Sequence, residues 1–213
     1  MNFETASYAT QRALWPTSGR HIMAHYDETS IVVYQAYNRY IGHYAATHGR
    51  FGGDFSFTRM SWVKPNFLWM MYRSGWGVKP NQEVTLAVRI LREGFDEMLR
   101  QCVHSNFVAE VYGDQPTWKS RLRSSQVRLQ WDPDHVPNGA KTERRAIQLG
   151  LRDEMLRLYG TEWVISIDDI SDFVAEQRAH RGDAERLMIP VERPYPVTSE
   201  AVVAHLGLST PPA

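Results

Sequence analysis

The chain has a single cysteine and lacks the common sequence motifs that bind phosphates or metals. Cys102 has no partner in the chain, so an internal disulfide is excluded, and this usage is typical of a reducing compartment. The glycine-rich GxGxxG and Walker loops are missing, and so are HExxH and CxxC, so we predict no metal site. No GxSxG elbow indicates a serine hydrolase.

Net charge and long apolar runs are missing as well. Lys plus Arg equals Asp plus Glu at 24 each, so no overall field draws the protein to nucleic acid or to an acidic membrane. No apolar run approaches the length of a membrane span, and the N-terminal residues lack the apolar centre of a signal peptide. We therefore expect a soluble, cytoplasmic protein without membrane contact.

Tryptophan, in contrast, is concentrated in residues 59–80, which have the sequence RMSWVKPNFLWMMYRSGWGVKP. Pro65 and apolar residues at three- and four-residue spacing predict a short helix, and Gly75 ends it because glycine adopts the left-handed conformation. Cationic and hydroxyl groups beside aromatic rings are typical of sites that hold an anion or a flat ring. The candidate binding residues here are Arg59, Ser61, Trp69, Tyr72, Arg73, Ser74 and Trp76. The alternative, that the aromatic residues are ordinary core, stays open.

The periodicity of the remaining chain predicts both strands and helices. Strands are predicted at residues 20–26, 55–60, 83–91, 127–131 and 163–167, and alternation is clearest at 83–91. A long helix is predicted over residues 28–47, with Asp27 as its N-cap and Gly49 at its end.

Strands and helices mix without a regular βαβα order, so the predicted class is α+β. We expect one compact domain with a mixed or antiparallel split sheet and flanking helices. Its predicted parts are an N-terminal arm (1–18), the domain itself (19–181) and a C-terminal tail that packs on it (182–213).

Charged residues at strand ends complete a candidate site. Arg20 opens the first predicted strand, Asp132 ends the strand VRLQW, and Glu143 follows the next turn. Cations facing carboxylates suit a ligand that carries phosphate and a reacting carbon that becomes positive. Ordinary salt bridges at sheet edges are the alternative.

A second cluster is purely basic and comprises Lys119, Arg121, Arg123 and Arg128. Such a cluster could follow a phosphate backbone, which makes a nucleic-acid-binding module the competing hypothesis. A solvated loop, in an interaction domain without any site, would explain the same residues.

Five segments carry a resemblance to a known family. They are RHIMAHYDETSIVVYQAYN, RMSWVKPNFLWMMYRSGWG, VRLQWDPDH, RRAIQLGL and WVISIDDISDFV. Over about residues 15–180 the chain resembles the family known as domain of unknown function 4291, whose name implies no reaction. More remotely, the layout is similar to the ADP-ribosyltransferase superfamily, in which a split sheet holds NAD in a central cleft.

The remote resemblance implies roles for several residues. In those enzymes a first-strand Arg or His contacts the ribose or phosphates, and Arg20 matches it. A middle-strand Ser, Thr or Tyr cradles nicotinamide, which Ser61 or Tyr72 matches. The late-strand glutamate has no clean counterpart, and Asp132 or Glu143 stands in its place.

The resemblance thus implies an NAD-using enzyme of ADP-ribosyltransferase type. Arg20 and Arg73 would hold the pyrophosphate, Tyr72 or Trp76 would stack on nicotinamide, and Asp132 or Glu143 would stabilise the transition state. NAD is the implied nucleotide substrate, whereas the acceptor stays open, with a nucleic acid and a protein as the candidates. Arg20 and Arg73 are then expected to point into one shared cleft.

Overall fold

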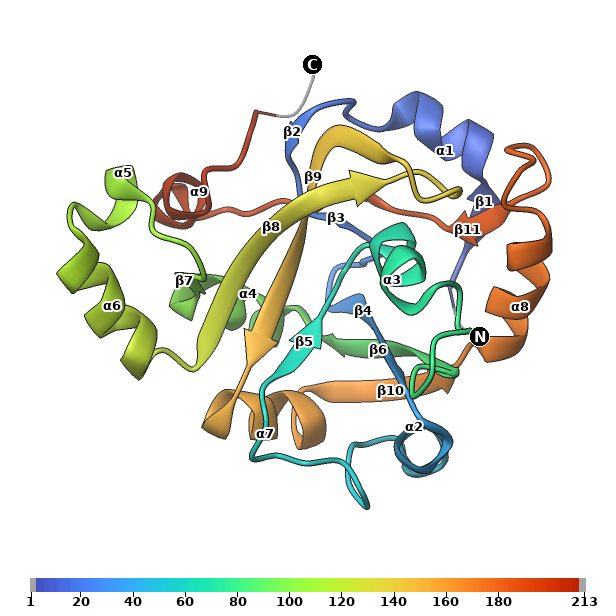
Figure 1. The fold of residues 1–213 in the computed structure, drawn as a ribbon, viewed down its shortest axis with the longest axis horizontal. Coiled ribbons are helices and arrows are strands. Elements are labelled where there is room, and N and C mark those ends of the chain that lie inside the picture. Colours follow the sequence, from blue (N-terminus) through green and yellow to red (C-terminus); the bar gives the residue numbers. More distant parts are fainter. Residues whose placement is uncertain (1–2, 211–213) are drawn as a thin grey trace.

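A computed structural model describes residues 3–210 (Figure 1). Residues 1–2 of the predicted arm and 211–213 of the predicted tail lie outside the described part. The helices are α1 (Tyr8–Leu14), α2 (Arg39–His48), α3 (Phe67–Ser74), α4 (Arg92–Gln101), α5 (Ala109–Tyr112), α6 (Gln115–Ser124), α7 (Asp153–Thr161), α8 (Ser171–Ala179) and α9 (Glu200–Leu206). The strands are β1 (Thr5–Ser7), β2 (Gly19–Arg20), β3 (Met23–Ala24), β4 (Ser30–Tyr37), β5 (Ser61–Val63), β6 (Val84–Leu91), β7 (Val103–His104), β8 (Val127–His135), β9 (Lys141–Leu151), β10 (Val164–Asp169), β11 (Met188–Pro190) and β12 (Arg193–Pro194).

Two sheets organise the domain, which confirms the α+β class with mixed and antiparallel sheets. A three-stranded antiparallel sheet has the order β10-β6-β4. A mixed sheet has the order β2-β9-β8-β7, with β5 also pairing β9. The residue after β5, Lys64, forms a bridge with Tyr34 of β4, and Tyr34 N–H donates to the Lys64 carbonyl at 2.7 Å. This bridge brings the two sheets together along one seam.

The predicted strand at residues 83–91 is confirmed as β6. Val84, Leu86, Val88 and Ile90 lie on one face and join the main hydrophobic core between the sheets. The other face of the same sheet packs against a second core around α3 and α8. The three-stranded sheet is therefore covered on both faces.

The predicted helix over residues 28–47 is wrong in its first half, which forms strand β4. The run from Ile31 to Tyr34 is fully buried because one face of β4 contacts each core, so its side chains show no alternation of apolar and polar types. Such a run cannot be told from a buried helix by period alone. The helix begins only at Arg39, where the Asn38 side chain accepts from Ile41 N–H, and Gly49 ends it with φ of 64°.

Two other strand predictions are wrong, and a third is confirmed over a longer range. Residues 20–26 form two separate two-residue strands, because β2 pairs β9 whereas β3 pairs β12. Residues 55–60 form no strand: they contain a turn at 57–58 and a bend at 59, and Phe55 packs in an aromatic cluster with Phe51 and Tyr37. The strand predicted at 127–131 continues as β8 to His135.

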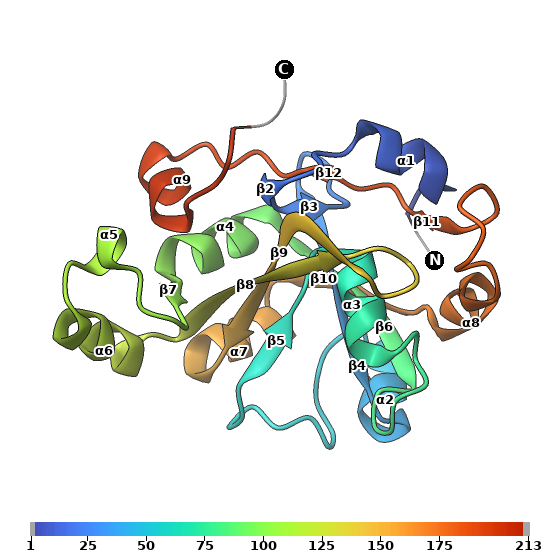
Figure 2. The same ribbon diagram turned by 45° about the horizontal axis from the view of Figure 1, so that its top comes forward.

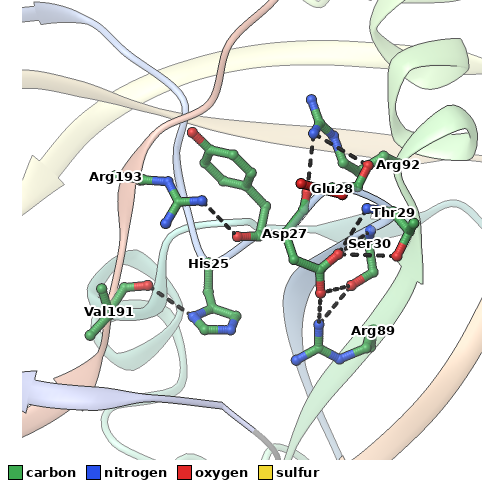
Figure 3. A network of polar contacts seen from close by, with 10 residues as sticks. His25, Asp27, Glu28, Thr29, Ser30, Arg89, Arg92, Val191 and Arg193 are labelled. Atoms are coloured by element: carbon green, nitrogen blue, oxygen red, sulfur yellow. Dashed lines mark hydrogen bonds and ion pairs between the residues drawn. The ribbon is translucent and has the colours of Figure 1, made fainter.

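Asp27 does accept backbone N–H groups, but it does so at the turn that leads into β4 (Figure 3). Its carboxylate accepts from the N–H groups of Thr29 and Ser30, from the Ser30 hydroxyl at 2.8 Å and from the Arg89 guanidinium at 3.2 Å. Burial alone would raise the pKa of Asp27, yet these hydrogen bonds hold it well below its usual value. The network fixes the start of β4.

The short helix predicted in the tryptophan-rich segment is confirmed as α3. The Asn66 side chain caps it by accepting from Trp69 N–H at 2.7 Å, and Gly75 ends it in the left-handed conformation with φ of 61°. A second acceptor comes from the C-terminal part of the chain, where the buried Glu192 carboxylate accepts from Phe67 N–H at 2.6 Å and from the Asn66 amide at 3.0 Å.

Both ends of the described chain pack on the domain. In Figures 1 and 2, both terminal helices lie in the upper part of the molecule, α1 to the right and α9 to the left. Residues of the predicted arm form β1 and α1, and β1 pairs antiparallel with β11. Leu206 of α9 is fully buried in the main core, so the C-terminal segment supplies part of that core.

Candidate functional site

The seam between the sheets opens into a cleft of about 470 Å³. Its walls come from β4, β5, β8, β9 and α3, and its polar lining residues are Gln35, Tyr37, Ser61, Lys64, Arg73, Gln82, Gln130 and Gln148. This volume lies within the range of small-molecule sites. We call this cavity the seam cleft.

One wall of the seam cleft is a hydrogen-bonded polar network. The Gln35 amide donates to Ser61 Oγ at 2.8 Å and to the Trp62 carbonyl at 3.1 Å. Its carbonyl oxygen accepts from the buried Tyr159 hydroxyl at 2.6 Å. Ser61 Oγ also pairs with the Tyr37 hydroxyl at 2.7 Å. Every polar atom of Gln35 is engaged, so Ser61 is held in a fixed place at the cavity wall.

Lys64 is the least expected residue of the seam cleft. Its side chain is buried, with only 4% of the residue exposed, yet it makes no hydrogen bond or ion pair with any residue of 3–210. Burial and, to a smaller extent, the nearby Arg73 guanidinium lower the pKa of Lys64, Asp132 opposes both, and the resulting pKa is about 8. An unpartnered buried amine is costly, so its presence at a cavity indicates a ligand or a reaction.

Arg73 lies in the last turn of α3 and contributes the second cation. It is exposed, and its guanidinium makes no hydrogen bond or ion pair with a residue of the described part. The five donors of the fork are thus available to an anion, which an arginine paired with an internal carboxylate would not offer.

The carboxylate of Asp132 lies on β8 close to the seam cleft. One oxygen accepts from the Gln130 amide at 3.0 Å and the other from the Gln148 amide at 2.7 Å. Gln130 and Gln148 are direct cross-strand partners, so the β8–β9 register brings both amides to one carboxylate. The predicted Asp132 carboxylate therefore has a fixed orientation, and it lies near enough to Lys64 to raise the pKa of that amine.

A second cavity of about 450 Å³ adjoins the seam cleft. The two share Tyr37, Met60 and Ser61 in their walls, and the second is also lined by Arg59 and Asp54. Arg59 and Ser61, both predicted from the sequence, thus lie on the same continuous groove.

Arg20 does not lie in this groove, so the expectation that it shares a cleft with Arg73 is wrong. Arg20 pairs in register with Arg145 on β9, and alternation places it on the sheet face opposite Gln148. Its guanidinium lies against Gly207, where a Cβ atom would come within 2.5 Å. Glu143 does not line the seam cleft or the adjoining cavity either, and it is exposed on β9 near the hairpin turn.

The predicted aromatic residues are mostly part of the packing. Trp69 and Trp76 are buried, at 6% and 5% exposure, and Trp76 belongs to the second core. The Tyr72 ring stacks on His135 with centroids 3.5 Å apart and lines, with Trp76, a separate cavity of about 280 Å³. Ser74, the last residue of α3, is fully buried, and its hydroxyl donates to the Met70 carbonyl at 3.0 Å within the same helix.

The tryptophan that does line the seam cleft is Trp62. Its indole is partly buried and lies over Gly150 of β9, where a Cβ atom would come within 3.0 Å of the ring. Glycine at this position lets the ring lie close to the strand.

The basic residues Lys119, Arg121 and Arg123 lie on α6, away from the residues that line the seam cleft. All three are exposed, and Arg121 lies over the Tyr112 ring at 6.0 Å. Arg128 is on β8, on the same face as Gln130. Nucleic-acid binding by these residues stays a prediction.

The sequence did not identify Gln35 and Gln148 as site residues, and it did not predict that Lys64 is buried. Gln35 was hidden inside a run predicted as helix, and Gln148 enters only through the β8–β9 register. A lysine directly before Pro65 at a helix start was the one local signal for Lys64.

Comparison with known proteins places the chain in one family. The family model described as domain of unknown function (DUF4291) matches residues 21–195. No curated protein matches the chain. Within residues 3–210, no group of three or more His, Cys, Asp or Glu side chains could hold a metal ion. No helix in this range is long and apolar enough to cross a bilayer.

Proposed function

The chain belongs to the DUF4291 family, whose name states no reaction, and we propose from the seam cleft that it is an NAD-using enzyme of ADP-ribosyltransferase type. One observation supports this most: two cations without a partner in residues 3–210, Lys64 just after β5 and Arg73 in α3, line a single cavity, and the oriented Asp132 carboxylate lies close to it. That separation of charge suits a substrate with an anionic pyrophosphate and a carbon that becomes positive during reaction.

In this proposal Arg73 holds the pyrophosphate, because a guanidinium can bind two phosphate oxygens at once. Arg20, which lies on the other sheet face, has no part in it. The adjoining cavity with Arg59 supplies room for the second half of a dinucleotide.

Ser61 and Trp62 would receive the nicotinamide ring. When Tyr37 donates to Ser61 Oγ, the Ser61 proton remains available for the carboxamide oxygen of the ligand. The Trp62 indole, rather than Tyr72 or Trp76, provides the flat surface for stacking.

Asp132 would act in the bond-breaking step. As the bond from ribose carbon to nicotinamide nitrogen breaks, its electron pair leaves with nicotinamide and the ribose carbon becomes positive. The Asp132 carboxylate, held by the Gln130 and Gln148 amides, stabilises that charge without having to reorganise. The acceptor then attacks the same carbon.

Calorimetric titration with NAD tests the binding step. Arg73→Lys keeps the charge but loses the bidentate geometry, so NAD should bind about tenfold or more weakly. The melting temperature should stay unchanged, because the Arg73 guanidinium has no partner in the described fold. Arg50→Lys is the matched control, since Arg50 is exposed and lines neither cavity.

Absence of NAD binding by the unmodified protein would overturn the proposal. Equal weakening by both variants would show that the effect does not come from the seam cleft.

A further inference from the structure

Lysine is rare in this chain, and its four occurrences fall into two kinds. The sequence has 4 lysines against 20 arginines. Lys79, Lys119 and Lys141 are exposed, whereas Lys64 is buried in the wall of the seam cleft. In a chain that uses arginine for nearly all its positive charges, the one buried lysine lies in the wall of this cavity.

Lysine differs from arginine in a property that matters here. Arginine stays protonated in proteins, whereas a buried lysine can release its proton and become a nucleophile. A site that needed only a cation would be served by either residue. A structural buried lysine usually forms an ion pair with a carboxylate or donates hydrogen bonds to carbonyl groups. The Lys64 amine does neither with any residue of 3–210.

We propose that Lys64 is a nucleophilic amine that forms an imine with an anionic aldehyde or ketone bound in the seam cleft. The cavity of about 470 Å³ has room for such a compound, and Arg73 beside Lys64 can take its phosphate or carboxylate group. This activity goes beyond the proposed use of NAD and does not depend on it.

The reaction needs no oxidant, reductant or metal. The neutral Lys64 nitrogen adds to the carbonyl carbon, and one of its two protons passes to the carbonyl oxygen to give a carbinolamine. The nitrogen then loses its remaining proton as the hydroxyl group leaves as water, and a carbon–nitrogen double bond forms. Ser61, Gln130 and Gln148 line the same cleft and offer groups that can hydrogen-bond to this oxygen.

Reductive trapping of the whole protein tests the proposal. Pyridoxal phosphate serves as the anionic aldehyde, cyanoborohydride reduces any imine, and peptide mass spectrometry locates the label on the four lysines. At pH 7.5 an amine with a pKa of about 8 has a neutral fraction roughly a hundredfold above that of an ordinary lysine. Label at Lys64 should therefore exceed that at each exposed lysine about tenfold or more, allowing for lower intrinsic nucleophilicity.

Two comparisons make the result specific. 5-Deoxypyridoxal, which lacks the phosphate group but keeps a free aldehyde, should label Lys64 less than pyridoxal phosphate does, and Arg73→Gln should remove that difference. Lys64→Arg should lose the selective label while the three exposed lysines react as before.

Label spread evenly over the four lysines, or confined to the exposed three, would overturn the proposal. This result can be read from the unmodified protein alone, so it does not depend on how any variant folds. No NAD is present, so failure here is distinct from failure of NAD binding.

Discussion

Replacing Lys64 with methionine should stabilise the protein at neutral pH. Methionine has a similar length and fills irregular space, so the substitution removes the charge with little change of volume. The folded state lowers the pKa of Lys64 from 10.5 to about 8, which means that burial of the charged amine is unfavourable. At 1.36 kcal/mol per pKa unit, this amounts to about 3 kcal/mol that the variant would recover.

The gain should depend on pH in a defined direction. Because the pKa of the folded state lies below that of the unfolded state, the unfolded chain binds more protons between pH 8 and pH 10.5. The destabilisation by Lys64 is therefore full below pH 8 and disappears as the pH rises toward 10.5. Lys64→Met should stabilise the protein most near pH 7 and should change its stability little near pH 10.5.

Urea denaturation at pH 7 and pH 10 measures this effect. Lys119→Met is the control, since Lys119 is exposed on α6 and its loss should change the free energy of unfolding by less than about 0.5 kcal/mol. If Lys64→Met were no more stable than the parent at pH 7, or gained equally at both pH values, Lys64 would not be a buried, unpaired amine.

Three further predictions concern other parts of the chain. Asp132→Asn should leave NAD affinity nearly unchanged but slow nicotinamide release about a hundredfold, as measured by chromatography, because the neutral amide cannot stabilise a cation; an unchanged rate would exclude Asp132. Asn66→Ala should destabilise the protein by about 1–2 kcal/mol in urea, since α3 loses its cap, and no loss would show that the cap is dispensable. Charge reversal at Lys119, Arg121 and Arg123 should weaken any oligonucleotide binding, and no binding by the parent at low salt would dispose of that hypothesis.

The local residue pattern was enough to predict several helices and strands correctly. Strand β6 has an apolar face with a strict period of two, and α3 has a terminating glycine, so neighbours within a few residues were enough to predict both. The charged and hydroxyl residues of 59–80 were also predicted as binding residues. Ser61 and Arg73 line the seam cleft, and Arg59 lines the cavity that adjoins it.

Long-range pairing decided the rest. Strand β4 is buried on both faces, and this removes the alternation that would have marked it as a strand. Arg20 and Arg73 looked equivalent as lone cations, but the register of β2 on β9 turns Arg20 to the opposite face. A sequence position alone does not say on which side of a sheet a side chain lies.

The seam cleft itself is a product of the tertiary structure. Gln130 and Gln148 meet Asp132 only because β8 and β9 pair in one register, and Lys64 is buried only because β5 joins two sheets. The sequence determined which chemical groups were available, whereas pairing between distant segments decided which of them face one another. An amine without a partner is recognisable only when all its neighbours are known, since burial and partner contacts depend on the whole fold.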